Sequence, residues 1–214
     1  MVTIELPLAT MIASLIVGAA LAAMLVSPQR WLSWSARAFV ELTRNTPTLV
    51  QLYCAFLVFN MLLTQALQSA GGNPLTPFFW VVAVTSLHKG AFHAESLRAG
   101  LQAIPAVTLE AAASLGFTRI GQLWLVQLPL ALRFALPSLI NNLVDLVDLV
   151  KMTTIASAIA VGDVTYQSIM IWTQRDNVLE LMLLLLLFFG ALTYFVNLGG
   201  RSLERHLRMP GYGQ

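Results

Sequence analysis

Long apolar runs alternate along the chain with shorter polar segments. Five runs are long enough to be membrane helices, and they cover residues 6–26, 48–67, 77–97, 135–161 and 179–198. A helix that crosses the hydrocarbon core of a membrane needs about 20 mostly apolar residues. The pattern therefore predicts an all-α integral membrane protein in which residues 1–214 form a single transmembrane domain with five spanning helices.

The composition agrees with this prediction. The chain is 57% hydrophobic and only 10% charged, whereas a soluble domain carries about 25% charged residues. The net charge of +2 is too small to indicate a nucleic-acid partner. The single cysteine, Cys54, excludes an intrachain disulfide. His88 and His93 are five residues apart and therefore on different helix faces, so we expect no metal site. Glu95 and Arg98 are three residues apart, so we expect them to form a local pair near the cytoplasmic end of the third span.

The basic side chains are distributed unevenly between the two sides of the predicted spans. One side carries Arg30, Arg37, Arg44, Arg98, Arg119, Arg133, Arg201, Arg205 and Arg208. The other side carries a single arginine, Arg175, between the fourth and fifth spans. Short cytoplasmic loops hold an excess of lysine and arginine, so we expect the N-terminus outside the cell and the C-terminus in the cytoplasm.

The segment between the third and fourth spans, residues 104–129, predicts two short helices rather than a simple loop. Pro105 suits the first turn of a helix, where its missing N–H costs nothing. Gly116 stands where a helix-ending residue of positive φ is expected. A second, amphipathic piece, Arg119–Leu128, is expected to end at Pro129. Taken alone, these residues fit either a docking helix for another protein or an interfacial helix that only joins two spans.

The spacing within this segment resembles the cytoplasmic loop of permease subunits from binding-protein-dependent ABC importers. The matching residues are Glu110, Ala111, Ala112, Gly116, Val126, Leu128 and Pro129. In that family the first loop helix is a coupling helix, which docks on a separate ATPase subunit. The residues that the resemblance assigns to this contact are Glu110, Ala111, Ala112, Gly116 and Arg119.

The energy source is expected to lie outside this chain. The sequence has no Gly-x-x-x-x-Gly-Lys-[Ser/Thr] phosphate loop. We therefore expect a transport subunit that is not an enzyme and binds no cofactor, with ATP and Mg²⁺ held by the partner ATPase.

Three further stretches resemble the polar amino-acid (histidine/glutamine-type) branch of these permeases. They are residues 36–52, which look like the loop before the second span, residues 94–105 and residues 136–161. The resemblance implies a type I ABC importer permease in the lipid of the bacterial cytoplasmic (inner) membrane. It also implies a second permease, identical or paralogous, two ATPase copies and a periplasmic or extracellular solute-binding protein. The expected substrate is a polar amino acid or an amino-acid-like solute, such as an opine or another acid-bearing derivative.

Charged residues within the predicted spans need a separate explanation. Asp145, Asp148 and Lys151 lie in the fourth apolar run, and each charge at a helix centre costs about 2.5–3.5 kcal/mol. Asn141, Asp145 and Asp148 share one helix face through their i, i+4, i+7 spacing, and Lys151 can pair with Asp148. Two interpretations remain open: an internal ion pair that locks one helix against its neighbours, or a polar wall of the translocation path.

In the second interpretation, an amino-acid substrate needs both signs of charge nearby. Asp145 or Asp148 could bind its ammonium group, and Lys89 or Lys151 its carboxylate, with His88 next to Lys89. An alternative function is an ion- or proton-coupled secondary transporter with Asp145, Asp148 and Lys89 as relay residues. A third possibility is a membrane subunit that only anchors a cytoplasmic protein.

Overall fold

The computed structural model describes residues 2–67, 75–147, 159, 161–162, 164–174 and 178–207. All regular structure in these ranges is helical. The elements are α1 (Val2–Leu25), α2 (Arg30–Arg44), α3 (Thr48–Tyr53), η1 (Cys54–Asn60), α4 (Met61–Ala66), α5 (Pro77–Gln102), α6 (Ala106–Ser114), α7 (Arg119–Gln122), η3 (Leu123–Gln127), α8 (Leu128–Val147), α10 (Val164–Gln174) and α11 (Val178–Leu207). The elements η1 and η3 are π-helical, with backbone hydrogen bonds between residues five apart.

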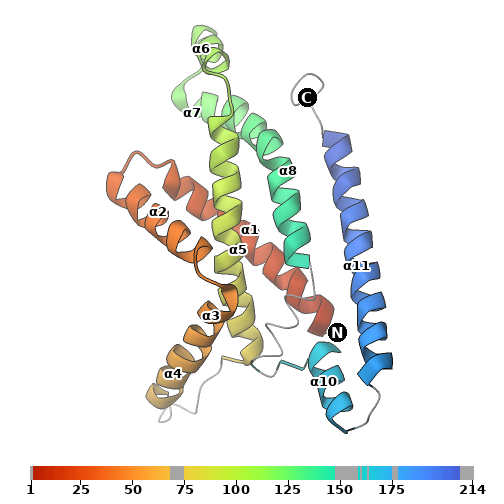
Figure 1. The fold of residues 1–214 in the computed structure, drawn as a ribbon. Helices are drawn as coiled ribbons and strands as arrows, with labels where there is room; N and C mark the ends of the chain where they lie inside the picture. The colour runs from red at the N-terminus through yellow and green to blue at the C-terminus, as the bar shows by residue number, and fades with distance from the viewer. Residues whose placement is uncertain are drawn as a thin grey trace.

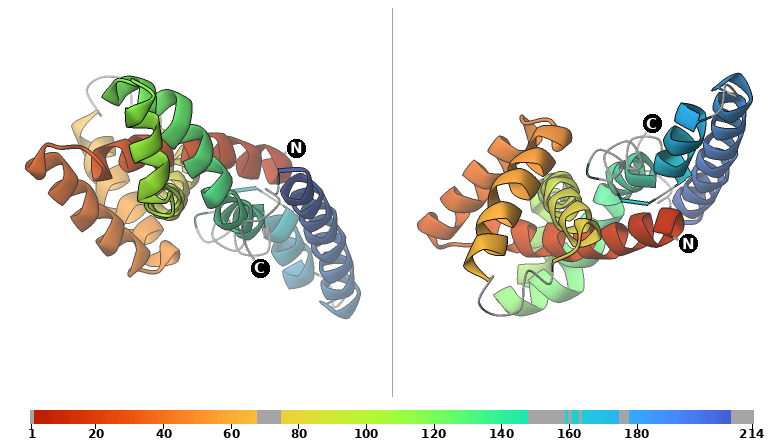
Figure 2. Two further views of the ribbon diagram at one scale, coloured as in Figure 1. Left: turned by 90° about the horizontal axis from the view of Figure 1, so that it is seen from above. Right: turned by 90° about the horizontal axis from the view of Figure 1, so that it is seen from below.

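Helix α5 is the centre of the bundle. Both views of Figure 2 look nearly along α5, which has α2 on one side and α8 on the other. In Figure 1, α1 crosses α5, and α11 lies at the edge of the bundle near α10. The short helix α6 projects at one end of the molecule, whereas the start of α1 lies in the opposite half. The main helices therefore surround α5 and leave α6 free at one end.

Glycine residues allow α1 and α5 to approach each other closely. A Cβ at Gly18 would lie 2.6 Å from the Cβ of His93, and a Cβ at Gly90 would lie 2.5 Å from Cγ1 of Val17. Carbon atoms in contact are about 3.5–4.0 Å apart, so side chains at these two positions would push the helices apart. Small residues at helix crossings allow such close approach within membranes. The two glycines therefore fix the point where α1 crosses α5.

Two clusters of buried apolar side chains hold the bundle together. The first consists of Leu6, Leu52, Val81, Val84, Ile159 and Val161. The second consists of Ala22, Leu25, Ala36, Val40, Ala91 and Ala94. Helices α1 and α5 contribute to both clusters. Helix α3 and the residues Ile159 and Val161 before α10 complete the first, and α2 completes the second. Residues 36–44, part of the stretch 36–52 that resembled the loop before the second span, thus belong to a helix packed against the core.

Four helices in the described part of the chain are long and apolar enough to cross a membrane, by length and composition. They are Glu5–Leu25, Thr48–Ala66, Arg119–Val144 and Val178–Gly199. The third predicted span corresponds to α5, which has 26 residues but is not among these four. Several of its polar side chains are buried against neighbouring helices, including Thr85, Ser86, His88, His93 and Ser96. Because other helices shield α5 from lipid, it does not need the hydropathy of a lipid-facing span.

The fourth span begins earlier than the sequence pattern indicated. Helix α7, the π-helical η3 and α8 follow one another without a break from Arg119 to Val147, so the prediction that Pro129 ends a separate helix is wrong. A π-turn changes the backbone hydrogen-bond register just before the proline, and this accommodates the N–H that proline lacks. Pro137 also lies inside α8. Residues 148–158 of the predicted span lie outside the described residues.

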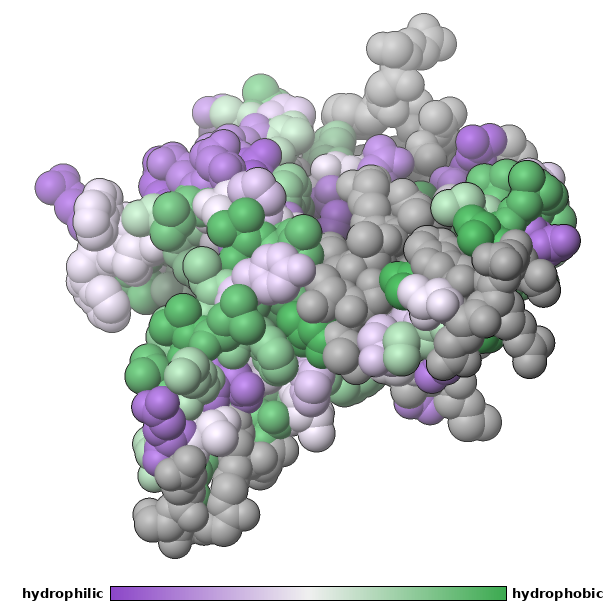
Figure 3. Space-filling model, turned by 60° about the horizontal axis from the view of Figure 1, so that its bottom comes forward, coloured by the Kyte–Doolittle hydropathy of each residue, from purple (hydrophilic) through white to green (hydrophobic). Residues whose placement is uncertain are grey.

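The outer surface is rich in apolar side chains. Figure 3 shows hydrophobic residues in green over much of the described surface on the side it presents. Leu57, Val58 and Phe59 in η1, and Leu186 and Leu187 in α11, are all more than half exposed. Such a surface is unfavourable in water and suits contact with lipid or with another membrane subunit.

Candidate functional site

The connection between α6 and α7 has a defined conformation. Helix α6 follows Pro105, which has extended backbone angles. Gly116 has a φ of 84°, as the sequence predicted. Its N–H donates to the carbonyl of Ala113 at 3.0 Å, and the N–H of Phe117 donates to the carbonyl of Ala112 at 3.2 Å. This pair of bonds is the Schellman pattern, which closes a helix C-terminus through a left-handed residue.

The start of α7 is fixed in a similar way. The N–H of Gly121 donates to Oγ1 of Thr118 at 3.2 Å, which is an N-cap bond. The side-chain amide of Gln122 donates to the carbonyl of Phe117 at 3.3 Å. Helix α6 packs on α7 and η3. The turn is therefore held mainly by its own hydrogen bonds.

Four of the five residues assigned to a docking contact are accessible. Glu110, Ala111, Gly116 and Arg119 are exposed. Ala112 is only 5% exposed, and its carbonyl accepts the bond that closes α6. In this conformation Ala112 supports the turn, whereas the other four remain available to a partner.

Three exposed apolar residues of this segment were missed by the sequence analysis. Val107, Leu115 and Ile120 are 71%, 78% and 72% exposed. A loop that only joins two spans needs no such residues, because each exposed aliphatic side chain is unfavourable in water. The sequence signal was present as isolated apolar residues beside Pro105 and Gly116. We refer to these three residues, together with Glu110 and Arg119, as the α6–α7 surface.

A second group of polar residues lies between α5 and α8. Oγ of Ser96 on α5 and Oγ of Ser138 on α8 are 2.7 Å apart. The side-chain amide of Asn142 donates to Oγ of Ser96 at 3.0 Å. Asn141, which the sequence pattern indicated as a pathway residue, is exposed, whereas Asn142 contacts α5. The i, i+4 spacing of Ser138 and Asn142 was the available signal.

Helices α5 and α8 run antiparallel, and their contact continues on both sides of Ser96 and Ser138. At one end, Gly100 of α5 packs against Ala131 of α8. Positions 89, 93, 96 and 100 follow one face of α5, and positions 131, 135, 138, 142 and 145 follow one face of α8. Continuing the register beyond Ser96 and Ser138 brings position 89 of α5 and position 145 of α8 to the same level. Nζ of Lys89 also lies 5.7 Å from the ring centroid of Phe92.

The remaining predicted pathway residues are separated from this register or lie outside the description. His88 is buried at 8% exposure. Asp148 and Lys151, with their predicted pairing, lie outside the described residues. His93 is completely buried, and neither of its ring nitrogens has a hydrogen-bond partner among the described residues. Among the described residues, no group of three or more His, Cys, Asp or Glu side chains is arranged to hold a metal ion.

A small polar cleft lies between α2 and α5. Its volume is about 180 Å³, and its lining residues are Leu25, Arg37, Val40, Glu41, Arg44, Glu95 and Arg98. Arg98 donates two hydrogen bonds to Glu95, at 2.9 and 2.6 Å, which confirms the local pair predicted from their i, i+3 spacing. We call this space the α2–α5 cleft.

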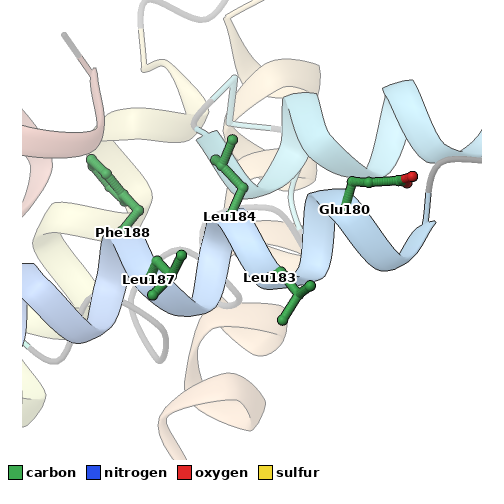
Figure 4. Close-up of a pocket in the computed structure, with 5 residues that line it drawn as sticks. All are labelled: Glu180, Leu183, Leu184, Leu187 and Phe188. Atoms are coloured by element: carbon green, nitrogen blue, oxygen red, sulfur yellow. The ribbon is translucent and has the colours of Figure 1, made fainter.

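A larger hollow along α11 has a different character. Glu180, Leu183, Leu184, Leu187 and Phe188 line it. Figure 4 shows these side chains along a single helix, with the Glu180 carboxylate at one end. One carboxylate beside four apolar side chains offers a polar solute little to bind, so this hollow suits a lipid chain or a packed subunit better.

Comparison with known proteins identifies the family. A family model described as "Binding-protein-dependent transport system inner membrane component" matches residues 14–209. The chain is 32% identical over 194 residues to the probable glutamine ABC transporter permease protein GlnM of Bacillus subtilis (strain 168), covering 91% of this chain and 84% of that protein. It is 39% identical over 168 residues to the glutamate transport system permease protein GluC of Corynebacterium efficiens, covering 76% and 71%.

A solved structure supports the same assignment. The fold superposes with a TM-score of 0.80 and 26% identity on a chain of a crystal structure of an amino acid ABC transporter with histidines, covering 95% of this chain and 90% of that one. The α6–α7 segment lies within the matched range 14–209. The chain belongs to the family of binding-protein-dependent transport system inner membrane components.

Proposed function

We propose that this permease subunit carries a polar amino acid or an amino-acid-like solute into the cytoplasm, and that ATPase subunits docked on the α6–α7 surface drive the transport. The family match over residues 14–209 carries the proposal. Relatives whose names refer to glutamine and glutamate support the substrate class. An acid-bearing derivative such as an opine belongs to the same class of substrate.

The geometry of the α6–α7 surface supports the coupling role. The turn is held by its own hydrogen bonds and projects from the bundle (Figure 1). Its apolar residues Val107, Leu115 and Ile120 offer a surface that would become buried on docking. The segment is also continuous with α8 through η3. A displacement of α6 would therefore be transmitted directly to a spanning helix.

The assembly that we propose is the one that the family assignment implies. The chain has no phosphate loop, so two ATPase copies would supply ATP hydrolysis with Mg²⁺. A second permease, identical or paralogous, would complete the pathway, and a solute-binding protein would deliver the substrate. The α6 end would face the cytoplasm and the start of α1 the outside, in agreement with the distribution of arginines.

The helix register, which brings positions 89 and 145 to one level, supports a polar lining between α5 and α8. Both signs of charge at one level suit a zwitterionic solute, whose carboxylate would be attracted by Lys89 and whose ammonium group by Asp145. Pairing of the two residues with each other is the competing explanation. A charge-exchanged double variant, Lys89→Asp with Asp145→Lys, separates the two roles, because a purely structural pair tolerates exchange better than a substrate site does.

The alternative of an ion- or proton-coupled secondary transporter is not favoured. The family match covers the loop segment as well as the spans, and a secondary transporter has no need of a docking surface for an ATPase. A subunit that only anchors a cytoplasmic protein would leave the charged positions inside the spans without a role.

Co-purification tests the coupling role. The full-length chain is extracted gently from its native membrane, and the proteins that accompany it are identified by mass spectrometry. We expect an ATPase with a phosphate loop to accompany the wild type and to be lost from Leu115→Arg. Leu42→Arg, which alters a leucine at 71% exposure on α2, outside the candidate spans, is the matched control and should retain it. Absence of any ATPase from a wild-type preparation that keeps its other partners would contradict the proposal.

Competition for uptake tests the substrate class. Cells that contain the complete system are given one labelled polar amino acid and an excess of unlabelled competitors. We expect competition from solutes that carry both an α-ammonium and a carboxylate group, and none from sugars or peptides of similar size. Competition by sugars alone would exclude the amino-acid class without affecting the coupling role.

A further inference from the structure

We propose that the α2–α5 cleft binds the phosphate group of an anionic phospholipid, and that α2 lies at the membrane–water interface beside it. This inference requires only that the chain lies in a membrane, and it is independent of the transported solute. Helix α2 has three different faces. One is buried against the bundle, one is apolar and exposed as acyl chains would require, and one is charged as a headgroup would require.

The first face of α2 is buried. Ala36, Val40 and Thr43 are 1%, 3% and 6% exposed, and the first two belong to the core cluster shared with α1 and α5. Oγ of Ser33 also donates to the carbonyl of Leu25 at the end of α1, at 3.0 Å. These contacts hold α2 against the bundle in one rotational setting.

The second face is apolar and exposed. Trp31, Trp34 and Leu42 are 69%, 74% and 71% exposed, and their spacing of three and eight residues places them on one stripe. Tryptophan is enriched at the level of lipid headgroups, where its ring meets the apolar region and its N–H meets water. An exposed stripe with two tryptophans therefore fits the interface of a membrane better than bulk water.

The third face is charged and borders the cleft. Arg30, Arg37, Glu41 and Arg44 are exposed and recur every three to seven residues along the helix. Arg37, Glu41 and Arg44 line the cleft, whereas Arg30 does not. The charged stripe lies next to the tryptophan stripe, so a headgroup in the cleft could have its acyl chains beside Trp31 and Trp34. This is the arrangement of an amphipathic interfacial helix.

The charges of the cleft favour a singly charged phosphate. Its lining has three arginines and two glutamates, a net charge of +1. Arg98 and Glu95 satisfy each other through two hydrogen bonds, and Arg44 also stacks with its guanidinium carbon 5.1 Å from the ring centroid of Phe92. Arg37 takes part in no ion pair among the described residues. A guanidinium can donate two parallel hydrogen bonds to phosphate oxygens, so Arg37 and Arg44 would bind the phosphodiester. The negative charge of Glu41 would disfavour a phosphate that carries more than one charge.

The volume of the cleft agrees with this occupant. About 180 Å³ is several times the roughly 30 Å³ that one water molecule takes up in the liquid. The space is too small for a whole lipid and sufficient for a phosphate with part of its glycerol. The acyl chains would have to lie outside, along the exposed apolar stripe.

Native mass spectrometry of the purified full-length chain with its co-purifying subunits tests the proposal. The probes are phosphatidylglycerol and phosphatidylethanolamine with the same acyl chains. We expect the wild type to bind phosphatidylglycerol more tightly, and Arg37→Gln to weaken that binding by about tenfold, as loss of one charge-assisted hydrogen bond would. Arg30→Gln is the matched control, since it removes the same charge from the same stripe outside the cleft. It should leave the affinity within a factor of about two.

Further arms identify the source of the phosphate and guard against misfolding. Arg37→Lys keeps the positive charge but cannot donate two parallel hydrogen bonds, so it should bind phosphatidylglycerol with intermediate affinity. This variant keeps the test usable if Arg37→Gln fails to fold. Inorganic phosphate should not displace the lipid, because it has no acyl chain to place beside Trp31 and Trp34. Three results would overturn the proposal. They are equal binding of both lipids, an equal loss of affinity for phosphatidylglycerol in Arg30→Gln and Arg37→Gln, and displacement of the lipid by inorganic phosphate. Cross-linking of a Trp34→Cys variant to the second permease through position 34 would also overturn it, by showing a protein on that stripe.

Discussion

A substitution at Gly116 tests the proposed role of the α6–α7 surface through a change in backbone conformation alone. Its φ of 84° lies in the left-handed region, and a Cβ at this position would meet no atom within 4 Å. Gly116→Ala therefore introduces no clash, and its cost is the strain of an L-residue in that region, about 1–2 kcal/mol. We call the turn closed when the two backbone hydrogen bonds at the end of α6 are formed and open when they are broken. The strain lowers the ratio of closed to open turns by about 5–30-fold.

The consequence should appear in the affinity of the ATPase and not in the stability of the bundle. Only the closed turn presents Val107, Leu115 and Ile120 together, so the affinity falls by up to the same factor when the open turn dominates. Helix α6 packs on α7 and η3, away from the core clusters. The midpoint of thermal unfolding should therefore remain close to that of the wild type.

The assay is a binding titration of the co-purifying ATPase against the permease in lipid nanodiscs. Gly116→Asn is the matched variant, because asparagine tolerates the left-handed region, and it should bind nearly as well as the wild type. Gly199→Ala, which also meets no atom within 4 Å but lies in α11, should have no effect. Wild-type affinity in Gly116→Ala, or equal losses in Gly116→Ala and Gly116→Asn, would refute the reasoning.

Three further predictions concern the contact between α5 and α8. Gly100→Ala should lower the thermal midpoint more than Gly199→Ala does, because its Cβ would collide with the carbonyl oxygen of Ala131; equal midpoints would contradict this packing. Ser96→Ala should destabilise the bundle by about 0.6–1.7 kcal/mol, since it removes the hydrogen bonds to Ser138 and Asn142; denaturant titration in detergent measures this, and no change would show that the bonds contribute nothing. Lys89→Asp should abolish substrate uptake while ATPase binding persists, and if Asp145→Lys restores uptake in the double variant, the two residues act as a structural pair.

The sequence predicted those features that depend on neighbouring residues. The apolar runs located most of the long helices, and the glycine between two short helical patterns predicted the positive φ at Gly116. The i, i+3 spacing of Glu95 and Arg98 predicted their pairing. In each case the physical cause lies within one or two helical turns, so a single sequence contains it.

The features that were missed depend on contacts between distant segments. Ser96 and Ser138 are 42 residues apart, and only the register of α5 against α8 brings them together. Pro129 was expected to end a helix because proline lacks an N–H, yet the π-helical η3 before it changes the hydrogen-bond register. Residues 36–44 resembled part of the loop before the second span of related permeases, yet they belong to α2, whose buried face packs on α1 and α5.

ATP-driven uptake into proteoliposomes tests the central claim most directly. The purified complex is reconstituted with its solute-binding protein on one side and ATP with Mg²⁺ on the side of α6, and entry of a labelled polar amino acid is measured. We predict that uptake requires ATP, persists when ionophores abolish the proton and sodium gradients, and is lost in Leu115→Arg. Uptake that follows an imposed ion gradient without ATP, and that Leu115→Arg leaves unchanged, would contradict the account.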